Sequence, residues 1–281
     1  MKRSLVGFVI IFCLCFSGCQ NQNNPASRDL SFTVSNMADA QSREEVRSII
    51  ERTLPKNNVT QFFESLDDYN KTIQKTSLTE GFEKAAPEYD IARISELWRG
   101  AKSPYIGTNC RITTFMLLKG TLQIPQGDSD DALLFMDTEA IATGKLFSKN
   151  ETEQFKRLFS RVKTENTEDI SVHASKMREY FLQFKFNDDA KMISVVLHDN
   201  LDGDYLFIGH VGVMIENHKE VLFIEKLSFG EPYQALKFRT EEDCRQYLLQ
   251  KYKDYSNEGS AKPFLMVNGE FAGNERSYSF K

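Results

Sequence analysis

The chain is poor in features that mark several common functional classes. It has one tryptophan and five cysteines among 281 residues, and no apolar run beyond the N-terminal one approaches the ~20 residues that span a bilayer. The sequence contains no zinc-ligand spacing, P-loop, dinucleotide-binding fingerprint or internal repeat. Its formal net charge of −5 gives no electrostatic footprint for nucleic acid or anionic headgroups. We therefore expect no metal, no cofactor and no nucleic-acid partner.

The N-terminal segment resembles the leader of bacterial lipoproteins. Lys2 and Arg3 precede an apolar stretch at 5–16, and the segment ends in Phe-Ser-Gly-Cys19. The resemblance implies cleavage after residue 18, diacylglycerol on the Cys19 sulfur, an acylated amine, and anchoring on the extracytoplasmic face of the cell membrane. Removal of Lys2 and Arg3 takes the formal net charge from −5 to −7. The alternative is an ordinary signal peptide that ends in a chance cysteine.

Few thiols remain once this leader is removed. Cys13 and Cys15 leave with it, and lipid blocks Cys19. Only Cys110 and Cys244 are then free, in a compartment where a free thiol needs a reason. The two thiols are therefore the first candidates for chemistry.

The remainder divides into a polar tether and one α+β domain. Residues 19–31 are polar and without periodicity, and 32–281 form the expected domain, helical over 36–165 and β-rich over 192–281. We expect helices to begin near the possible capping boxes Ser42–Glu45 and Asn58–Gln61, at Asp90 and at Thr240. Two further helices are expected at 131–143 and 152–162. The 22 phenylalanines indicate an aromatic-rich core.

Cys110 lies at the predicted start of a short, nearly all-apolar helix. Pro104 and Gly107 break the chain before it, and Thr108 or Asn109 can serve as N-cap. A helix that is apolar on nearly every side is a buried central helix. The helix dipole and the adjacent Arg111 would both favour a thiolate at Cys110. The competing interpretation is that Cys110 is a small buried hydrophobe.

A histidine in an apolar strand supplies a possible base. Alternation places His210 on one strand face with Leu206, Ile208, Gly212 and Met214, and Gly212 leaves room on that face for a bulky group. A buried histidine needs a polar partner.

The next strand offers that partner. A two-residue turn at Asn217-His218 would pair Ile215 with Glu220 and put Glu225 directly opposite His210. The pair would fix the imidazole tautomer and raise its basicity, unless it is only a structural His–Glu pair in the core.

Together these residues predict thiol chemistry. Glu225 would orient His210, His210 would deprotonate Cys110, and the thiolate would attack a carbonyl. The Cys110 backbone N–H would help to hold the oxyanion. Tyr105 or Asn109 is a candidate second donor, and Arg111 is a candidate substrate contact.

The order of helix-borne Cys110, strand-borne His210 in HVGVMI and polar Glu225 is similar to papain-like and NlpC-type cell-wall peptidases. The match covers about 115 residues. It implies a papain-like α+β fold and a thiol hydrolase or amidase acting on cell-wall peptides. Two departures weaken this resemblance. Asn109-Cys110-Arg111-Ile112 replaces the usual Asp-Cys-Ser-Gly, and the insert between Cys110 and His210 is longer than in compact NlpC domains. The whole chain also resembles a Gram-positive lipoprotein family of unassigned function. A non-catalytic binding lipoprotein on a degenerate peptidase fold is the alternative.

Other signals favour structural roles. Cys244 is expected in the core, although a disulfide to Cys110 would exclude the thiolate mechanism. The acidic stretch 199–204 does not match a calcium loop and is expected to form a hairpin loop. His173 and His218 are expected to be solvated.

Overall fold

The computed structural model describes residues 30–274. Predictions about the leader 1–18 and Cys19 lie outside the described residues. In chain order the elements are β1 (Phe32–Ser35), α1 (Ala40–Ile50), α2 (Lys56–Thr72), α3 (Ile91–Lys102), α4 (Cys110–Leu118), α5 (Phe135–Gly144), α6 (Lys149–Leu158), β2 (Val162–Lys163), α7 (Ile170–Phe181), β3 (Lys191–Asp199), β4 (Tyr205–Asn217), β5 (Glu220–Lys226), β6 (Tyr233–Phe238), α8 (Glu241–Tyr252), β7 (Phe264–Val267) and β8 (Glu270–Asn274).

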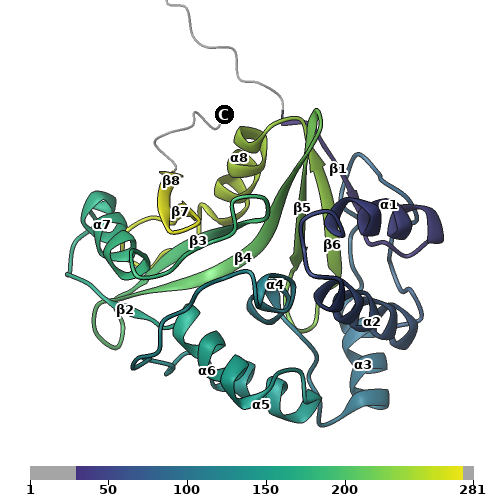
Figure 1. The fold of residues 1–281 in the computed structure, drawn as a ribbon, viewed down its shortest axis with the longest axis horizontal. Helices are drawn as coiled ribbons and strands as arrows, with labels where there is room; N and C mark the ends of the chain where they lie inside the picture. Colours follow the sequence, from purple (N-terminus) through teal and green to yellow (C-terminus); the bar gives the residue numbers. More distant parts are fainter. Residues whose placement is uncertain (1–29, 275–281) are drawn as a thin grey trace, which may run out of the picture.

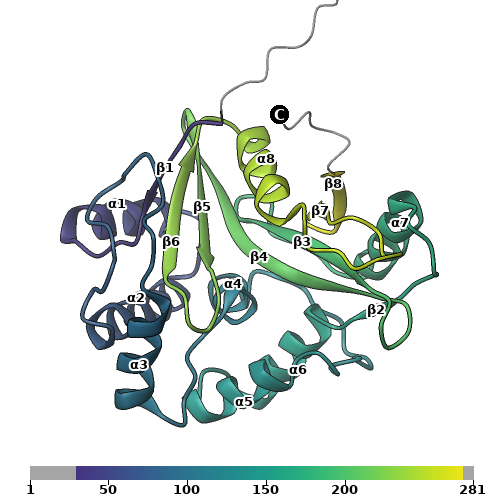
Figure 2. The ribbon, with the colours of Figure 1, turned by 180° about the vertical axis from the view of Figure 1, so that it is seen from behind.

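The described strands form one antiparallel sheet with helices on both faces. Its order is β1-β6-β5-β4-β3-β7-β8, and β2 pairs with β4 outside this path. α4 lies against one face and α8 against the other (Figures 1 and 2). The larger core cluster includes α4, and the smaller one includes the apolar residues of α8. The expected α+β class is confirmed.

α4 is the buried central helix that its sequence predicts. Every residue from Cys110 to Leu118 is buried except Arg111, and the Asn109 side chain accepts a hydrogen bond from Ile112 N–H at 3.0 Å. The helix packs on β4 and β5 and against α2. Because its sides are enclosed, its N-terminus is held rigidly.

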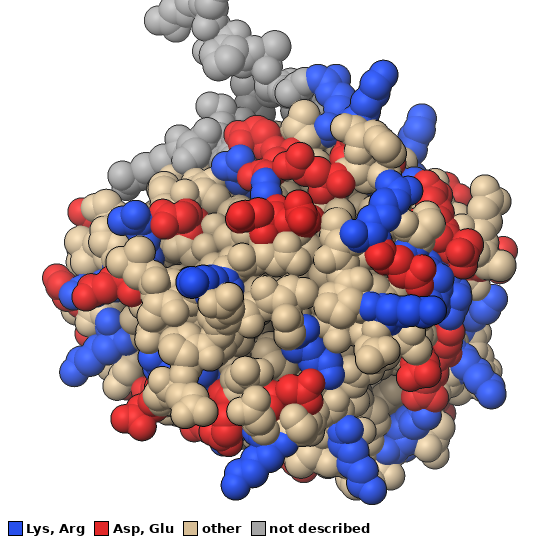
Figure 3. All heavy atoms as spheres, in the orientation of Figure 1, with Lys and Arg blue, Asp and Glu red and all other residues tan. Residues whose placement is uncertain are grey.

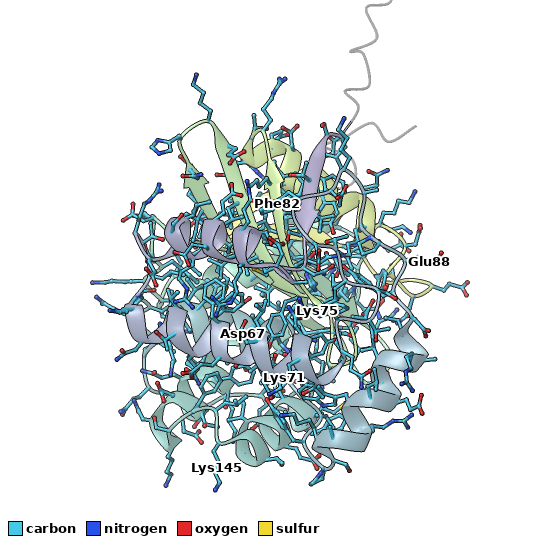
Figure 4. All side chains as sticks on the ribbon, turned by 90° about the vertical axis from the view of Figure 1, so that its right-hand side faces the viewer. Asp67, Lys71, Lys75, Phe82, Glu88 and Lys145 are labelled. Carbon is cyan, nitrogen blue, oxygen red and sulfur yellow. The ribbon has the colours of Figure 1, made fainter. Side chains whose placement is uncertain are left out.

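α2 separates α4 from solvent on one side. Phe62, Phe63 and Leu66 are buried in the core, whereas Asp67 and Lys71 are exposed. Figure 4 views this side, with Asp67 and Lys71 on the outward part of α2. The helix is thus amphipathic, with an apolar face toward the centre of the molecule.

Two of the expected helix caps are wrong. Asp39 caps α1 by accepting from Ser42 N–H at 2.9 Å, so Ser42 lies inside the helix. α2 follows Pro55 without a side-chain cap. Asn58 is instead buried within α2 and donates to the Leu117 carbonyl at 3.0 Å, so its amide joins α2 to α4.

The other two expected helix caps are confirmed. Asp90 caps α3, and Thr240 caps α8. The helix expected at 152–162 begins earlier, behind a capping box formed by Ser148 and Glu151, and the one expected at 131–143 runs as α5. The segment 199–204 joins β3 to β4 as the expected hairpin loop. β1, β2, α7 and β8 have no counterpart among the expected elements.

The turn between β4 and β5 differs from the expected one by two residues in register. Asn217 pairs with Glu220 and Val213 with Ile224, so the loop is His218-Lys219. His218 has φ of 57°, the left-handed region that such a turn requires. The prediction of Glu225 directly opposite His210 is therefore wrong. A shift of two keeps every residue on its original strand face, because side chains alternate with period two.

A β-bulge in β4 changes the face expected for the first half of the strand. Val195 pairs with His210 but Val196 pairs with Ile208, which leaves Gly209 as the extra residue. Ile208 consequently joins the α4 side of the core, while Met214 joins the α8 side. The uniform alternation expected from 206 to 214 is wrong because a bulge inserts one residue and reverses the pattern.

Candidate functional site

The thiol of Cys110 lies in the first turn of α4. Pairing between β4 and β5 ends at Val213–Ile224, before His210 is reached. The two strands are therefore unpaired at His210, where the first residue of α4 meets the imidazole. The imidazole of His210 is the neighbour that most lowers the pKa of the Cys110 thiol, so the two side chains interact directly. Cys110 is 6% exposed and His210 2% exposed.

Glu225 is the hydrogen-bond partner of His210. Its Oε2 lies 2.5 Å from His210 Nε2, and its side chain is fully buried. The contact is diagonal between the strands, since the register differs from the expected one. Gly212 makes the expected room: a Cβ there would lie 2.4 Å from the Phe223 ring, which fills that space. The structure thus brings Cys110, His210 and Glu225 together.

Three side chains of α8 complete the surroundings of the His–Glu pair. Lys251 Nζ and Tyr247 Oη each lie 3.2 Å from Glu225 Oε1. The ring of Tyr252 stacks on His210, with ring centroids 4.9 Å apart. Sequence reasoning missed these contacts. The available signal was that Tyr247 and Lys251 lie three and seven residues after Cys244, on the same helix face as that expected core residue.

The charges of this cluster favour ionised Glu225 and His210. Burial raises the pKa of Glu225, but Lys251 and His210 outweigh it and bring that pKa to about 2. Burial lowers the pKa of His210, but the Glu225 carboxylate and the Cys110 thiolate outweigh it and bring that pKa to about 9. At neutral pH the imidazole therefore carries its proton.

Cys110 and Cys244 differ in their electrostatic environments. Burial raises the pKa of Cys110, but His210 and then Arg111 outweigh it, so that pKa is lowered. Burial raises the pKa of Cys244 well above its usual value. Both cysteines are free, so the disulfide that would exclude a thiolate does not form. The surroundings therefore favour the thiolate at Cys110 and disfavour it at Cys244.

Asn109 and Arg111 share one buried carboxylate. Asn109 Nδ2 donates to Asp137 Oδ1 at 2.8 Å. Arg111 makes a two-point pair with Asp137 at 3.0 and 2.8 Å and also donates to the Ile208 carbonyl at 3.1 Å. These side chains fix the start of α4 between α5 and β4. Asp137 was missed, because nothing in the sequence links α5 to the cysteine.

Tyr105 packs against Trp98 and Gly144. Its ring lies 5.9 Å from that of Trp98, and a Cβ on Gly144 would lie 2.7 Å from it. Burial and then the charge of Asp68 raise its pKa to about 12. The role of Tyr105 as a second oxyanion donor stays a prediction.

A fully buried lysine, also missed, lies beside the site. Lys226 Nζ donates to the Ser228 carbonyl at 2.8 Å and to that of Glu231, and it lies 4.0 Å from the centre of the Tyr69 ring. Burial lowers its pKa well below the usual value, and the charges of Glu231 and Cys110 oppose that effect. Lys226 thus fixes the 227–232 loop that follows Glu225. Its position in an apolar strand was the available signal.

The two remaining histidine predictions have different outcomes, since His218 is exposed as expected and His173 is not. His173 is fully buried, with Nδ1 at 2.7 Å from Thr164 Oγ1, so its expected solvation is wrong. Its ring packs on His198 at 4.4 Å. No group of three potential metal-ligating side chains occurs among residues 30–274.

Comparison with known proteins places the chain in a family without giving it an activity. Within the described range, no helix has the length and apolar character needed to cross a membrane. No curated protein and no solved structure matches the chain significantly. A family model described as "Domain of unknown function (DUF4300)" matches residues 33–272, which is most of the chain. The chain therefore belongs to the DUF4300 family.

Proposed function

We propose that this protein is a thiol hydrolase of papain-like type that cleaves amide bonds. Cys110 is the nucleophile, His210 the general acid and base, and Glu225 the group that orients His210. The observation that carries the proposal is the buried cluster in which His210, whose Nε2 lies 2.5 Å from Glu225 Oε2, is the neighbour that most lowers the pKa of the Cys110 thiol. The raised pKa of His210 and the lowered pKa of Cys110 support a thiolate–imidazolium pair at neutral pH.

The proposed reaction has two steps, acylation of Cys110 and hydrolysis of the resulting thioester, and His210 transfers a proton in each. The Cys110 thiolate attacks the substrate carbonyl carbon, and the C–N bond breaks as His210 gives its proton to the leaving amine. Water then attacks the resulting thioester while His210 takes up its proton, which releases the carboxylic acid and regenerates the thiolate. The Cys110 N–H, in a helical turn whose N–H groups lack intrahelical acceptors, would donate to the oxyanion.

The location and substrate class rest on the sequence. The lipoprotein-like leader supports anchoring through lipid on Cys19, and the resemblance to NlpC-type enzymes supports cell-wall peptides as substrates. On the face that Figure 3 draws, blue and red side chains are interspersed, so this face has no continuous basic patch of the kind that binds nucleic acid.

A binding protein without catalysis is the second candidate. The observation that favours it is the small exposure of Cys110, whose residue is 6% accessible. A substrate carbonyl would need side chains around the thiol to move before attack. If they do not move, the same three residues would be a buried polar network that only stabilises the fold.

Reaction with iodoacetamide at pH 7, located by peptide mapping, tests the reactive pair. We expect alkylation of Cys110 at least about tenfold faster than that of Cys244, since each unit of thiol pKa changes the thiolate fraction about tenfold. His210→Ala should slow the reaction at Cys110, and Cys244→Ala should leave it unchanged. An inert Cys110, or a rate indifferent to His210→Ala, would contradict the proposal.

Hydrolysis is tested separately with peptide fragments of purified cell wall. New amino groups should appear with the wild type and with Cys244→Ala, and should be absent with Cys110→Ala. A reactive Cys110 that releases no amine from any fragment would favour the binding protein.

A further inference from the structure

An apolar cavity of about 340 Å³ lies near the start of α4. Its walls include Ile94 and Trp98 of α3, Pro104 and Ile106 of the segment before α4, Met136 of α5, and Phe229. This volume is at the small end of the range of ligand pockets, which run from roughly 300 to 1,000 Å³. It suits one large apolar side chain.

The cavity shares its walls with the elements that hold the thiol. Gly107 has φ of 94°, and a Cβ there would lie 3.2 Å from the Trp98 ring and 3.7 Å from the Phe229 carbonyl oxygen. Gly107 is three residues before Cys110, which is at most about 11 Å of extended chain. Met136 precedes Asp137, which bonds both residues that flank Cys110. A substrate peptide could therefore reach from the thiol to the cavity within about three residues.

A second cavity, of about 550 Å³, adjoins the histidine side of the site. Arg111, Phe207 and Tyr255 are among the residues that line it. Tyr255 packs against Tyr252, which stacks on His210. Arg111, directly after Cys110, lines the 550 Å³ cavity, and Ile106, four residues before Cys110, lines the apolar cavity, so the chain on each side of the cysteine borders a different cavity.

The position of the proton donor gives the direction of the substrate. His210 must deliver its proton to the leaving amine, so the amine side of the substrate lies toward β4 and the 550 Å³ cavity. The acyl side then extends along the segment before Cys110, toward the apolar cavity.

We propose that the substrate carries a large apolar side chain on the acyl side of the scissile bond, within about three residues of its carbonyl, and that the cavity of Trp98, Ile106, Met136 and Phe229 binds it. This inference rests on the proposed thiol hydrolysis. It assigns the cavity as the acyl-side specificity site.

Trp98 makes binding directly measurable, because it is the only tryptophan of the chain and lines the cavity. Tryptophan fluorescence should change saturably when the full chain is titrated with N-acetylphenylalaninamide. Its affinity should be at least about tenfold higher than that of N-acetylalaninamide, because only the former buries a large apolar group. Equal responses to the two amides would overturn the inference.

Met136→Glu tests the wall of the cavity. Met136 is 42% exposed, so we expect the variant to fold, and its carboxylate should weaken binding of N-acetylphenylalaninamide about tenfold or more. Leu182→Glu is the matched control, since Leu182 is 65% exposed and follows α7, which lies on the opposite side of the molecule from α3 in Figure 1. Circular dichroism checks the fold of both variants. Unchanged affinity in Met136→Glu would contradict the assignment.

Chloromethyl ketones of N-acetylphenylalanine and N-acetylalanine tie the cavity to the thiol. With iodoacetamide as the reference reagent, the phenylalanine compound should label Cys110 about tenfold faster than the alanine compound. Labelling by iodoacetamide with no preference between the ketones overturns this inference and leaves the proposed function intact. A Cys110 inert to every reagent overturns both, even if the amide binds near Trp98.

Discussion

Glu225 is the residue on which the charge state of the site depends. It is a fully buried carboxylate, and such a group is stable only when its partners replace water. His210, Lys251 and Tyr247 do so here, each within hydrogen-bonding distance. Because His210 is also buried, loss of the carboxylate would leave the imidazolium without its main compensating charge.

We expect Glu225→Gln to lower the pKa of His210 from about 9, because removal of an adjacent opposite charge disfavours the protonated ring. The Cys110 thiolate would then lose its cationic partner. The pH at which iodoacetamide alkylation of Cys110 reaches half its maximum should therefore rise by about one to three units. The measurement is the alkylation rate as a function of pH.

Glu216→Gln is the control for that profile. Glu216 also lies on β4, but its side chain is 69% exposed and pairs with Lys191 at the surface. Glu216→Gln should leave the pH dependence of Cys110 alkylation unchanged. An alkylation profile unaltered by Glu225→Gln would mean that the carboxylate does not set the charge of His210.

For individual residues, the sequence predicted that His210 and Glu225 meet, but it did not predict the geometry of their contact. His210 and Glu225 could be paired from alternation alone, because an error of two in register preserves the strand face. The diagonal geometry could not be predicted, since it depends on a turn one residue later than the expected Asn217-His218. Lys251 and Asp137 were not predicted, because no pattern in the sequence links Lys251 to Glu225 or Asp137 to the start of α4.

Among the elements, α4 matters most for the site, because its first turn positions the thiol. The Asn109 side chain both caps the helix and donates to Asp137, which in turn binds Arg111. One side chain therefore links the helix start to α5. This connection explains how a helix terminus can be rigid while the segment before it contains Pro104 and Gly107.

We expect Asn109→Ala to reduce the free energy of unfolding by about 1–2 kcal/mol, from the lost cap and the lost bond to buried Asp137. It should also change the alkylation rate of Cys110, because the helix start would shift. Ser148→Ala removes the comparable cap of α6, which also accepts from a backbone N–H, and should cost about 1 kcal/mol without affecting Cys110. Urea denaturation and alkylation are the measurements. Equal effects of both variants on Cys110 would contradict a positioning role for Asn109.

The elements also show where local signals fail. Asp90 and Thr240 were predicted correctly because each cap directly precedes an apolar helical pattern. Asn58 has the same local pattern, yet its amide is used in a tertiary contact with α4. The bulge at Gly209 has a comparable origin: a Cβ there would lie 2.3 Å from Leu197, a contact between strands that the sequence of β4 alone does not contain.

For the whole molecule, the site is built from helices on opposite faces of the sheet. α4 brings the thiol from one face, and α8 brings the partners of Glu225 from the other. They meet where β4 and β5 cease to pair. Such a site requires the complete sheet, because β4 and β5 hold His210 and Glu225 while the helices hold everything around them. We infer that the thiol chemistry and the fold will be lost together on denaturation.

Anchoring is the last property of the whole molecule that can be tested directly. Covalent geometry limits the distance between Cys19 and Leu30, where the described chain begins, to about 40 Å. If Cys19 carries lipid, the site is therefore confined to the space close to the membrane.

A tagged fatty acid fed to cells should label the wild type and not Cys19→Ala, whereas Cys110→Ala, the control for a thiol in the folded domain, should be labelled like the wild type. Cys19→Ala should also leave the membrane fraction, because a lipid chain contributes about 0.8 kcal/mol per buried CH₂ and nothing else in the proposal holds the protein there. Equal labelling of the wild type and Cys19→Ala would contradict lipid attachment at this cysteine.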